Sequence, residues 1–120
     1  MTGGAKITRG YRLPARHVIH AVGPVWNQGS HGEDAALASC YTSAVELCQS
    51  HSLASVAFPA ISTGIYRFPA DRAARIAVKT TVTALAAAPA VSRVIFCCFS
   101  KESAALHAEA MAEFGSPCAD

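Results

Sequence analysis

Residues 55–69 read SVAFPAISTGIYRFP. The first part, SVAFPA (55–60), is a short apolar run, which predicts a buried strand. Small residues and a glycine follow it, and Pro69 suits the first turn of a helix. A strand that passes through a small-residue turn into a helix is the building unit of parallel α/β sheets. This stretch therefore sets the fold class that we expect for the chain.

The same alternation of strand and helix extends in both directions from this segment. Two strands are expected before it, AKIT (5–8) and HVIHAV (17–22), and one after it, RVIFCCF (93–99). Short apolar runs that end at turn signals are typical of buried strands. Such strands between amphipathic helices predict an α/β fold, in which helices cover both faces of a largely parallel sheet.

Three amphipathic helices are expected. The first covers about residues 34–50, and Ser30 and Glu33 before it have the spacing of a capping box. Ser100 is the expected N-cap of the last helix, with Glu102 in its first turn. Inward-facing positions repeat at helical spacing: Leu37, Cys40, Tyr41, Ala44, Val45 and Cys48 on the first helix, Ala74, Val78, Thr81, Val82 and Leu85 on the second, and Leu106, Ala110 and Phe114 on the last.

Length and composition indicate one domain, residues 1–120. The chain is 52% hydrophobic and 15% charged, which suffices for a buried core. Its net charge is +2, and its lysines and arginines form no dense run, so we expect no nucleic-acid or membrane-surface partner. No apolar stretch approaches the roughly 18 residues of a membrane span. The start, MTGGAKITRG, lacks the apolar region of a signal peptide.

The cysteines and histidines predict no metal or cofactor site. The five cysteines show no CxxC spacing, and we interpret them as buried thiols of a protein in the reducing cytoplasm: Cys40, Cys48, Cys97, Cys98 and Cys118. His17 and His20 lie on opposite faces of one expected strand, so they cannot share a metal ion. His51 is near a helix end, where a partial positive charge is favourable.

The turn within ISTGIYRF (61–68) follows the carboxyl end of its strand, where ligands bind in open α/β sheets. Free N–H groups and the dipole of the next helix favour an anion there, and small residues let a phosphate approach the backbone. The turn is therefore either a phosphate site built from main-chain donors or an ordinary connection. It is not a Walker A loop, because GxxxxGK[ST] is absent, and Ser62 is not in the GxSxG of a nucleophile elbow.

Four segments, taken in order, resemble the macrodomains. They are GGAKITRGYRLPARHVIHAVGPVW (3–26), EDAAL (33–37), VAFPAISTGIYRFP (56–69) and VIFCCFS (94–100). The resemblance covers about residues 3–114 and points to the MacroD type, the O-acetyl-ADP-ribose deacetylases and ADP-ribosyl hydrolases. It implies a three-layer α/β/α fold with a mixed, largely parallel sheet.

The resemblance also implies the ligand, ADP-ribose or O-acetyl-ADP-ribose, and an ADP-ribosylated protein as a further partner. In the family, the turn that matches Ser62, Thr63, Gly64, Ile65 and Tyr66 wraps the diphosphate through its backbone N–H groups. The aromatic at Tyr66 borders the distal ribose, and the aromatic at Phe99 lies beside the adenine. These assignments suit the chemistry, because phosphates need donors and a purine needs a flat apolar face.

Two further positions take an expected role from the resemblance. His20 matches a histidine common in the family's VIHxVGP, where a structural role is favoured. Relatives often carry glycine at position 67, and Arg67 either pairs with a phosphate or, the favoured alternative, faces solvent.

The chain also departs from the family pattern at its start. It begins at the TGxAxIT segment, so we expect an incomplete macrodomain that lacks the first strands and helix, the Asn-Ala-Ala-Asn segment and the GVDGAIH loop. That loop supplies the Asp usually assigned to hydrolysis, so no catalytic residue is expected here. Three functions stay open: an ADP-ribosyl hydrolase, a non-catalytic ADP-ribose-binding module and an inactive fragment. An uncovered sheet edge would favour self-association.

Overall fold

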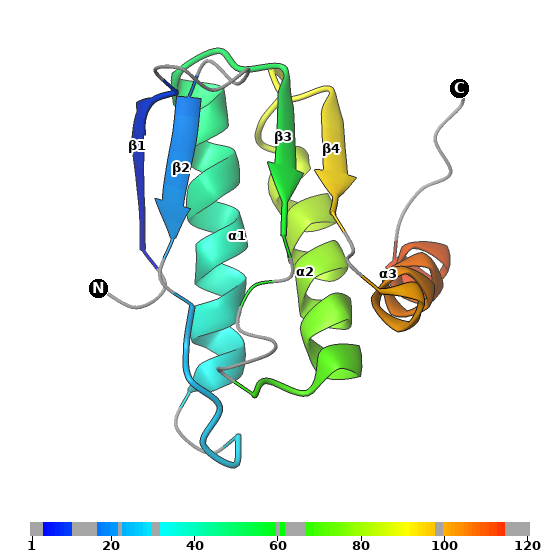
Figure 1. Cartoon of the computed structure of the whole chain (residues 1–120). Coiled ribbons are helices and arrows are strands. Elements are labelled where there is room, and N and C mark those ends of the chain that lie inside the picture. The colour runs from blue at the N-terminus through cyan, green and yellow to red at the C-terminus, as the bar shows by residue number, and fades with distance from the viewer. Residues whose placement is uncertain are drawn as a thin grey trace.

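The computed structural model describes residues 4–10, 17–21, 23–29, 32–59, 61, 67–97 and 100–114. Helices α1 and α2 lie behind the strands, and α3 packs beside α2 (Figure 1). The order of elements is the one predicted from the sequence: β1 (Ala5–Arg9), β2 (His17–Ala21), α1 (Glu33–Ser50), β3 (Ser55–Phe58), α2 (Ala70–Leu85), β4 (Arg93–Phe96) and α3 (Lys101–Phe114). None of these helices is long and apolar enough to cross a membrane.

The strands form two separate pairs within the described part of the chain. β1 and β2 are antiparallel, with Ile7 opposite Ile19. β3 and β4 are parallel, with Phe58 opposite Phe96. Both orientations expected of a mixed sheet are therefore present, and α1 packs against β1, β2 and β3.

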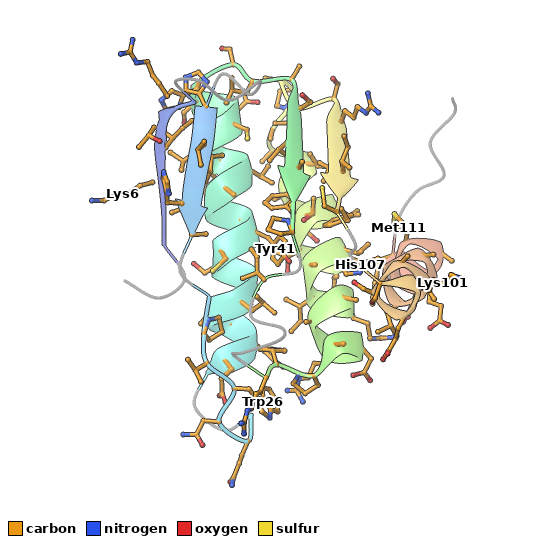
Figure 2. The ribbon with its side chains drawn as sticks, in the orientation of Figure 1. Lys6, Trp26, Tyr41, Lys101, His107 and Met111 are labelled. Carbon is orange, nitrogen blue, oxygen red and sulfur yellow. The ribbon has the colours of Figure 1, made fainter. Side chains whose placement is uncertain are left out.

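The core lies between α1, α2 and the strand face that these helices cover. Every inward position predicted on α1 is buried. Tyr41 from this helix packs edge-on against Phe58 of β3, with ring centroids 5.0 Å apart, and Figure 2 shows Tyr41 between α1 and the strands. Phe58 in turn stacks on Phe96 of β4 at 6.1 Å. Helix α1 therefore anchors the parallel pair through an aromatic contact.

The inner face of α2 differs from the prediction at one position. Ala74, Val78 and Thr81 are buried as expected, but Val82 is 36% exposed. Ala73 is buried and Val82 is not, because α2 packs against α1 on one side and α3 on the other. Small alanines on two sides of a helix allow both neighbours to approach closely.

The face of the parallel pair that points away from α1 and α2 is open in the described part of the chain. Ser55, Ala57 and Arg93 are exposed there, and Ile95 is 41% exposed. Helix α1 packs against the strands on the opposite face. Alternate residues of a strand point to opposite faces, so only half of each strand is buried.

The prediction of buried thiols holds in part. Cys40 and Cys48 on α1 are buried and free, whereas Cys97, just after β4, is exposed. The expectation for Cys97 was wrong because β4 ends one residue earlier, at Phe96, so Cys97 is not part of the strand. Cys98 and Cys118 lie outside the described residues.

Candidate functional site

The carboxyl ends of β3 and β4 meet the N-termini of α2 and α3 at one edge of the molecule (Figure 1). β3 ends at Phe58 and α2 begins at Ala70. β4 ends at Phe96 and α3 begins at Lys101. The first turn of a helix has unpaired N–H groups and the positive end of the helix dipole. Two such turns at one edge favour an anionic ligand, as the sequence predicted for this edge.

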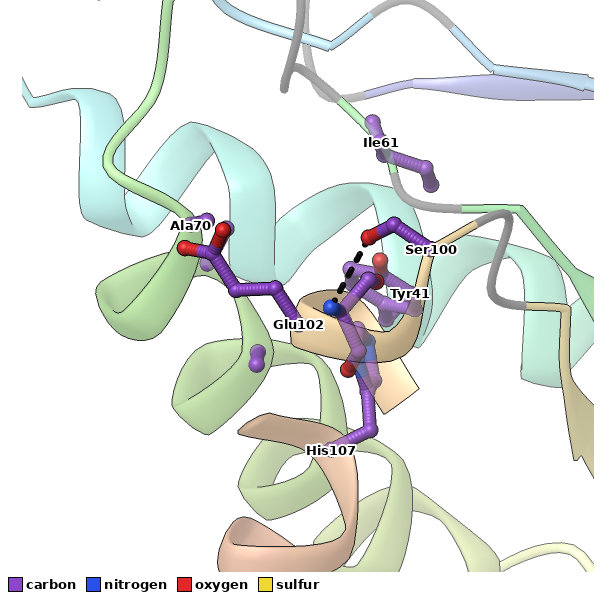
Figure 3. Close-up of a pocket in the computed structure, with 9 residues that line it drawn as sticks. Tyr41, Ile61, Ala70, Ser100, Glu102 and His107 are labelled. Atoms are coloured by element: carbon purple, nitrogen blue, oxygen red, sulfur yellow. Dashed lines mark hydrogen bonds between the residues drawn. The ribbon is translucent and has the colours of Figure 1, made fainter. Parts of the chain in front are cut away.

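A cavity of about 170 Å³ opens between these first turns (Figure 3). Ile61, the residue directly before the predicted phosphate turn, lines it together with Tyr41 from the core. The other lining residues come from the beginnings of the two helices: Ala70, Ala73 and Ala74 on α2, and Ser100, Glu102, Ser103 and His107 at α3. The predicted turn therefore begins at a cavity that faces two helix N-termini.

Ser100 caps α3 beside this cavity. Its Oγ accepts a hydrogen bond of 3.0 Å from the backbone N–H of Ser103, drawn as the dashed line in Figure 3. This confirms the N-cap predicted from the sequence. The bond occupies one of the unpaired donors of the first turn and orients the start of the helix toward the cavity.

His107 lines the cavity, and its sequence context predicts no role for it. The side chain is only 6% exposed, and its Nδ1 lies 2.8 Å from the carbonyl oxygen of Ser103. A carbonyl only accepts, so Nδ1 carries a proton and donates it to this oxygen. The ring also packs 5.4 Å from that of Phe96. The sequence feature that could have indicated this contact is the spacing of four residues between Ser103 and His107, which places both on the same face of the helix.

A buried carboxylate holds the loop of residues 23–29 against the start of α1. The Glu33 side chain accepts hydrogen bonds from the backbone N–H groups of Asn27, at 2.8 Å, and Gly29, at 3.0 Å. Glu33 is 3% exposed, and the N-cap position of the helix is Gly32, which makes no side-chain cap. Ser30 lies outside the described residues. Glu33 thus reaches back as a capping residue does, but its partners are in the preceding loop.

Trp26 connects this loop to the start of α2. Its ring lies 4.9 Å from that of Phe68 and 5.3 Å from the guanidinium carbon of Arg72. Arg72 also forms a two-pronged ion pair with Asp34 of α1, and this hydrogen bonding raises the pKa of Arg72 further above its usual range. Figure 2 shows Trp26 at this end of the molecule. These contacts hold Phe68, and with it the end of the predicted turn, against α1.

The predicted ligand residues themselves lie outside the described residues. This holds for Ser62, Thr63, Gly64, Ile65, Tyr66 and Phe99 alike, so their roles stay predictions. Arg67, directly after the turn, is described. It is exposed, as expected of a solvent-facing side chain, and its φ of 61° lies in the left-handed region that favours glycine.

The histidines of β2 have local partners. His20 Nε2 lies 3.1 Å from the hydroxyl of Thr8 on β1, which fits the structural role expected of it. The ring of His17 is 5.9 Å from that of His51, whose Nδ1 contacts the Leu47 carbonyl at 3.0 Å. Across the described ranges, no three His, Cys, Asp or Glu side chains gather as metal ligands would.

Comparison with known proteins identifies the family to which this chain is similar. The model of the Macro domain family matches residues 1–77. A Macro domain-containing protein of Mesorhizobium japonicum is 54% identical over 92% of this chain and 62% of its own length. An O-acetyl-ADP-ribose deacetylase of Escherichia fergusonii is 43% identical over 95% of this chain and 64% of its own length.

Solved structures agree with these sequence matches. A mutant of the Oceanobacillus iheyensis macrodomain with ADPR matches with a TM-score of 0.88 and 38% identity, over 94% of this chain and 60% of that one. The Trypanosoma brucei macrodomain in complex with ADP-ribose matches with a TM-score of 0.82 and 34% identity, over 91% and 45%. The chain spans between 62% and 65% of the length of the first curated relatives that it matches.

Proposed function

The chain belongs to the Macro domain family, and on that premise we propose that it binds ADP-ribose where β3 and β4 end. One observation carries the proposal: Ile61, at the start of the predicted phosphate turn, lines a cavity between the N-termini of α2 and α3. A diphosphate at this point would be close to two positive helix ends. Macrodomains of known structure that are 34% and 38% identical contain ADP-ribose or ADP, which supports the choice of ligand.

Within this proposal, the residues predicted from the sequence keep their roles. The backbone N–H groups of residues 62–66 donate to the diphosphate, Tyr66 borders the distal ribose, and Phe99 lies beside the adenine. The Ser100 hydroxyl keeps α3 oriented toward the ligand by capping it. Trp26 contacts Phe68 at the far end of the turn, and Arg72 contacts the Trp26 ring in turn.

The 120-residue chain by itself is expected to bind ADP-ribose weakly. The cavity of about 170 Å³ is smaller than the ~300–1,000 Å³ that encloses a typical small-molecule ligand. Three charge-assisted hydrogen bonds from the turn contribute roughly 4–9 kcal/mol, while association costs about 4–15 kcal/mol. Micromolar binding needs about 8 kcal/mol net. We therefore expect a dissociation constant in the millimolar range.

We propose hydrolysis only for a longer polypeptide that has the full length of the relatives, and not for these 120 residues. Relatives named O-acetyl-ADP-ribose deacetylase are 43% identical, but the chain covers only 64% of their length. The described cavity residues provide a hydroxyl, a carboxylate and an imidazole, but Ser100 and His107 are already engaged by the backbone of α3. On this proposal the 120 residues hold the ligand and do not turn it over.

The test is a titration of the purified chain with millimolar ADP-ribose, followed by NMR, for two variants matched in charge. Gly64→Glu places a carboxylate against the phosphates and should abolish binding. Ala105→Glu makes the same charge change at an exposed position of α3 outside the cavity and should bind as the unmodified chain does. Circular dichroism checks that both variants are folded. Equal binding by the two variants would place the ligand elsewhere.

A further inference from the structure

Among the described residues that line the cavity between α2 and α3, His107 is the only one that can supply a positive charge. The described lining contains no Lys or Arg, and it includes the carboxylate of Glu102. With a neutral imidazole, the lining side chains therefore give the cavity a negative charge, although two helix N-termini favour an anion in it. A proton on His107 cancels that negative charge.

The two ring nitrogens of His107 have different surroundings. Nδ1 donates to the Ser103 carbonyl at 2.8 Å, and the Ser103 amide donates in turn to Oγ of Ser100. Within the described part of the chain, Nε2 has no hydrogen-bond partner, but it is not sealed from solvent as the unpaired atoms His17 Nδ1 and Thr81 Oγ1 are. Because the side chain is only 6% exposed and lines the cavity, Nε2 is reached through the cavity (Figure 3).

The His107 ring is already held in place without a ligand. The bond to the Ser103 carbonyl fixes one side of the ring, and Phe96 of β4 packs against it with ring centroids 5.4 Å apart. A protonated imidazole carries a proton on both nitrogens, so the bond from Nδ1 is kept when Nε2 gains its proton. The new N–H donor therefore faces the cavity without a change of rotamer.

No other side chain that lines the described cavity can play this part. Tyr41 of α1 and Glu102 of α3 are the other titratable groups of the lining, and α2 contributes only alanines to it. The two cations of α2 that contact α3, Arg75 and Lys79, reach the C-terminal end of that helix, beyond His107. Histidine is the side chain whose charge ordinarily changes between about pH 5 and pH 8. Acid therefore changes the charge of this cavity through His107.

We propose that protonated His107 donates a hydrogen bond from Nε2 to an anionic phosphoryl group in the cavity, so that ADP-ribose binds more tightly as the pH falls. The inference rests on the proposed function, and it adds a side-chain donor to the backbone N–H groups of the turn. A cavity of about 170 Å³ is too small for a whole nucleotide but accommodates one phosphoryl group. A buried charge without a partner is costly, so the proton and the anion stabilise each other.

The main experiment follows the imidazole signals of the unmodified chain by NMR between about pH 5 and pH 8, with and without ADP-ribose. The diphosphate keeps its charge over this range, so any pH dependence comes from the protein. ADP-ribose should bind about tenfold more tightly at the acid end, which is the gain from one charge-assisted hydrogen bond. Because linkage is reciprocal, bound ADP-ribose should also raise the pH at which His107 gains its proton.

Sulfate, whose charge is also constant over this range, is the second probe and tests the anion contact alone. His107 signals that respond to neither probe, or an ADP-ribose affinity that is the same at both ends of the range, overturn the proposal. Such a result with ADP-ribose still bound leaves the proposed function standing. A response of His107 to sulfate without any binding of ADP-ribose supports the anion contact and refutes the proposed function.

Two histidine variants assign the pH dependence to one residue. His107→Gln keeps a polar side chain that cannot gain a proton, so its affinity for ADP-ribose should be the same at both ends of the range. His51→Gln makes the same change at the C-terminal end of α1, outside the cavity, and should keep the acid gain. Circular dichroism at both pH values checks that the variants are folded, and the NMR titration of the unmodified chain decides if His107→Gln is not. An equal acid gain in both variants refutes the proposal.

Discussion

The loop before α1 predicts a large loss of stability on the substitution Gly29→Ala. The φ of Gly29 is +78°, and left-handed backbone costs other residues about 1–2 kcal/mol. A Cβ there would lie 2.7 Å from Cη2 of Trp26, so the indole ring must move. Moving it weakens the tilted ring contact with Phe68, worth about 0.5–1.5 kcal/mol, and the contact with Arg72, worth about 0.5–1 kcal/mol. The expected loss in the free energy of unfolding is therefore about 2–4.5 kcal/mol.

Gly32→Ala is the matched control. The φ of Gly32 is +75°, but a Cβ there meets no atom within 4 Å, so only the backbone cost of about 1–2 kcal/mol is expected. The assay is urea unfolding followed by fluorescence, which reports Trp26 alone because the chain has one tryptophan. In a Trp26→Ala background, followed by circular dichroism, the loss from Gly29→Ala should fall to that from Gly32→Ala. Equal losses for both glycines in the unmodified background would refute the argument.

Three further predictions concern single side chains. Phe99→Ala should weaken the binding of ADP-ribose more than the binding of ribose 5-phosphate. The difference should be about 0.5–1.5 kcal/mol beyond the loss expected from the apolar area that Phe99 buries, and equal losses in the two titrations would rule out the adenine contact. Arg67→Gly should stabilise the chain by about 0.5–1 kcal/mol, because φ at this position is +61°, whereas Arg67→Ala should not; a thermal melt in which the two behave alike would contradict this. Burial raises the pKa of the Cys48 thiol, so its contribution to stability is complete below the ordinary thiol pKa and is lost as pH rises through the raised value. Cys48→Ala should therefore lose less stability than the unmodified chain between about pH 8 and pH 10, and parallel curves would show that Cys48 plays no part.

The secondary structure was largely predictable because it depends on neighbours in the sequence. The buried stripe of α1 follows from apolar residues at helical spacing, and every predicted member is buried. The cap of α3 follows from Ser100 and its distance along the chain to the Ser103 amide. The position of the cavity at the strand ends was predictable for the same reason, since it depends on a strand, a small-residue turn and a helix in succession.

The errors occur where distant parts of the chain decide the outcome. Val82 has the spacing of an inward residue, yet α2 has a neighbour on each side and turns this position outward. Cys97 is part of an apolar run, but its exposure depends on what lies against the end of β4. The partners of Glu33 could not be predicted either, because a loop conformation brings the amides of Asn27 and Gly29 to its carboxylate.

The sequence by itself determined the order of strands and helices, the family and the position of the expected phosphate turn, because each is encoded in residues close together along the chain. Only the tertiary structure decided that the first turns of α2 and α3 enclose a cavity with His107 in its wall. It also decided that Arg72 reaches Asp34, 38 residues away, and that a groove separates β2 from β3. These features depend on how helices and strands pack, and packing joins groups whose separation in the sequence carries no periodic signal.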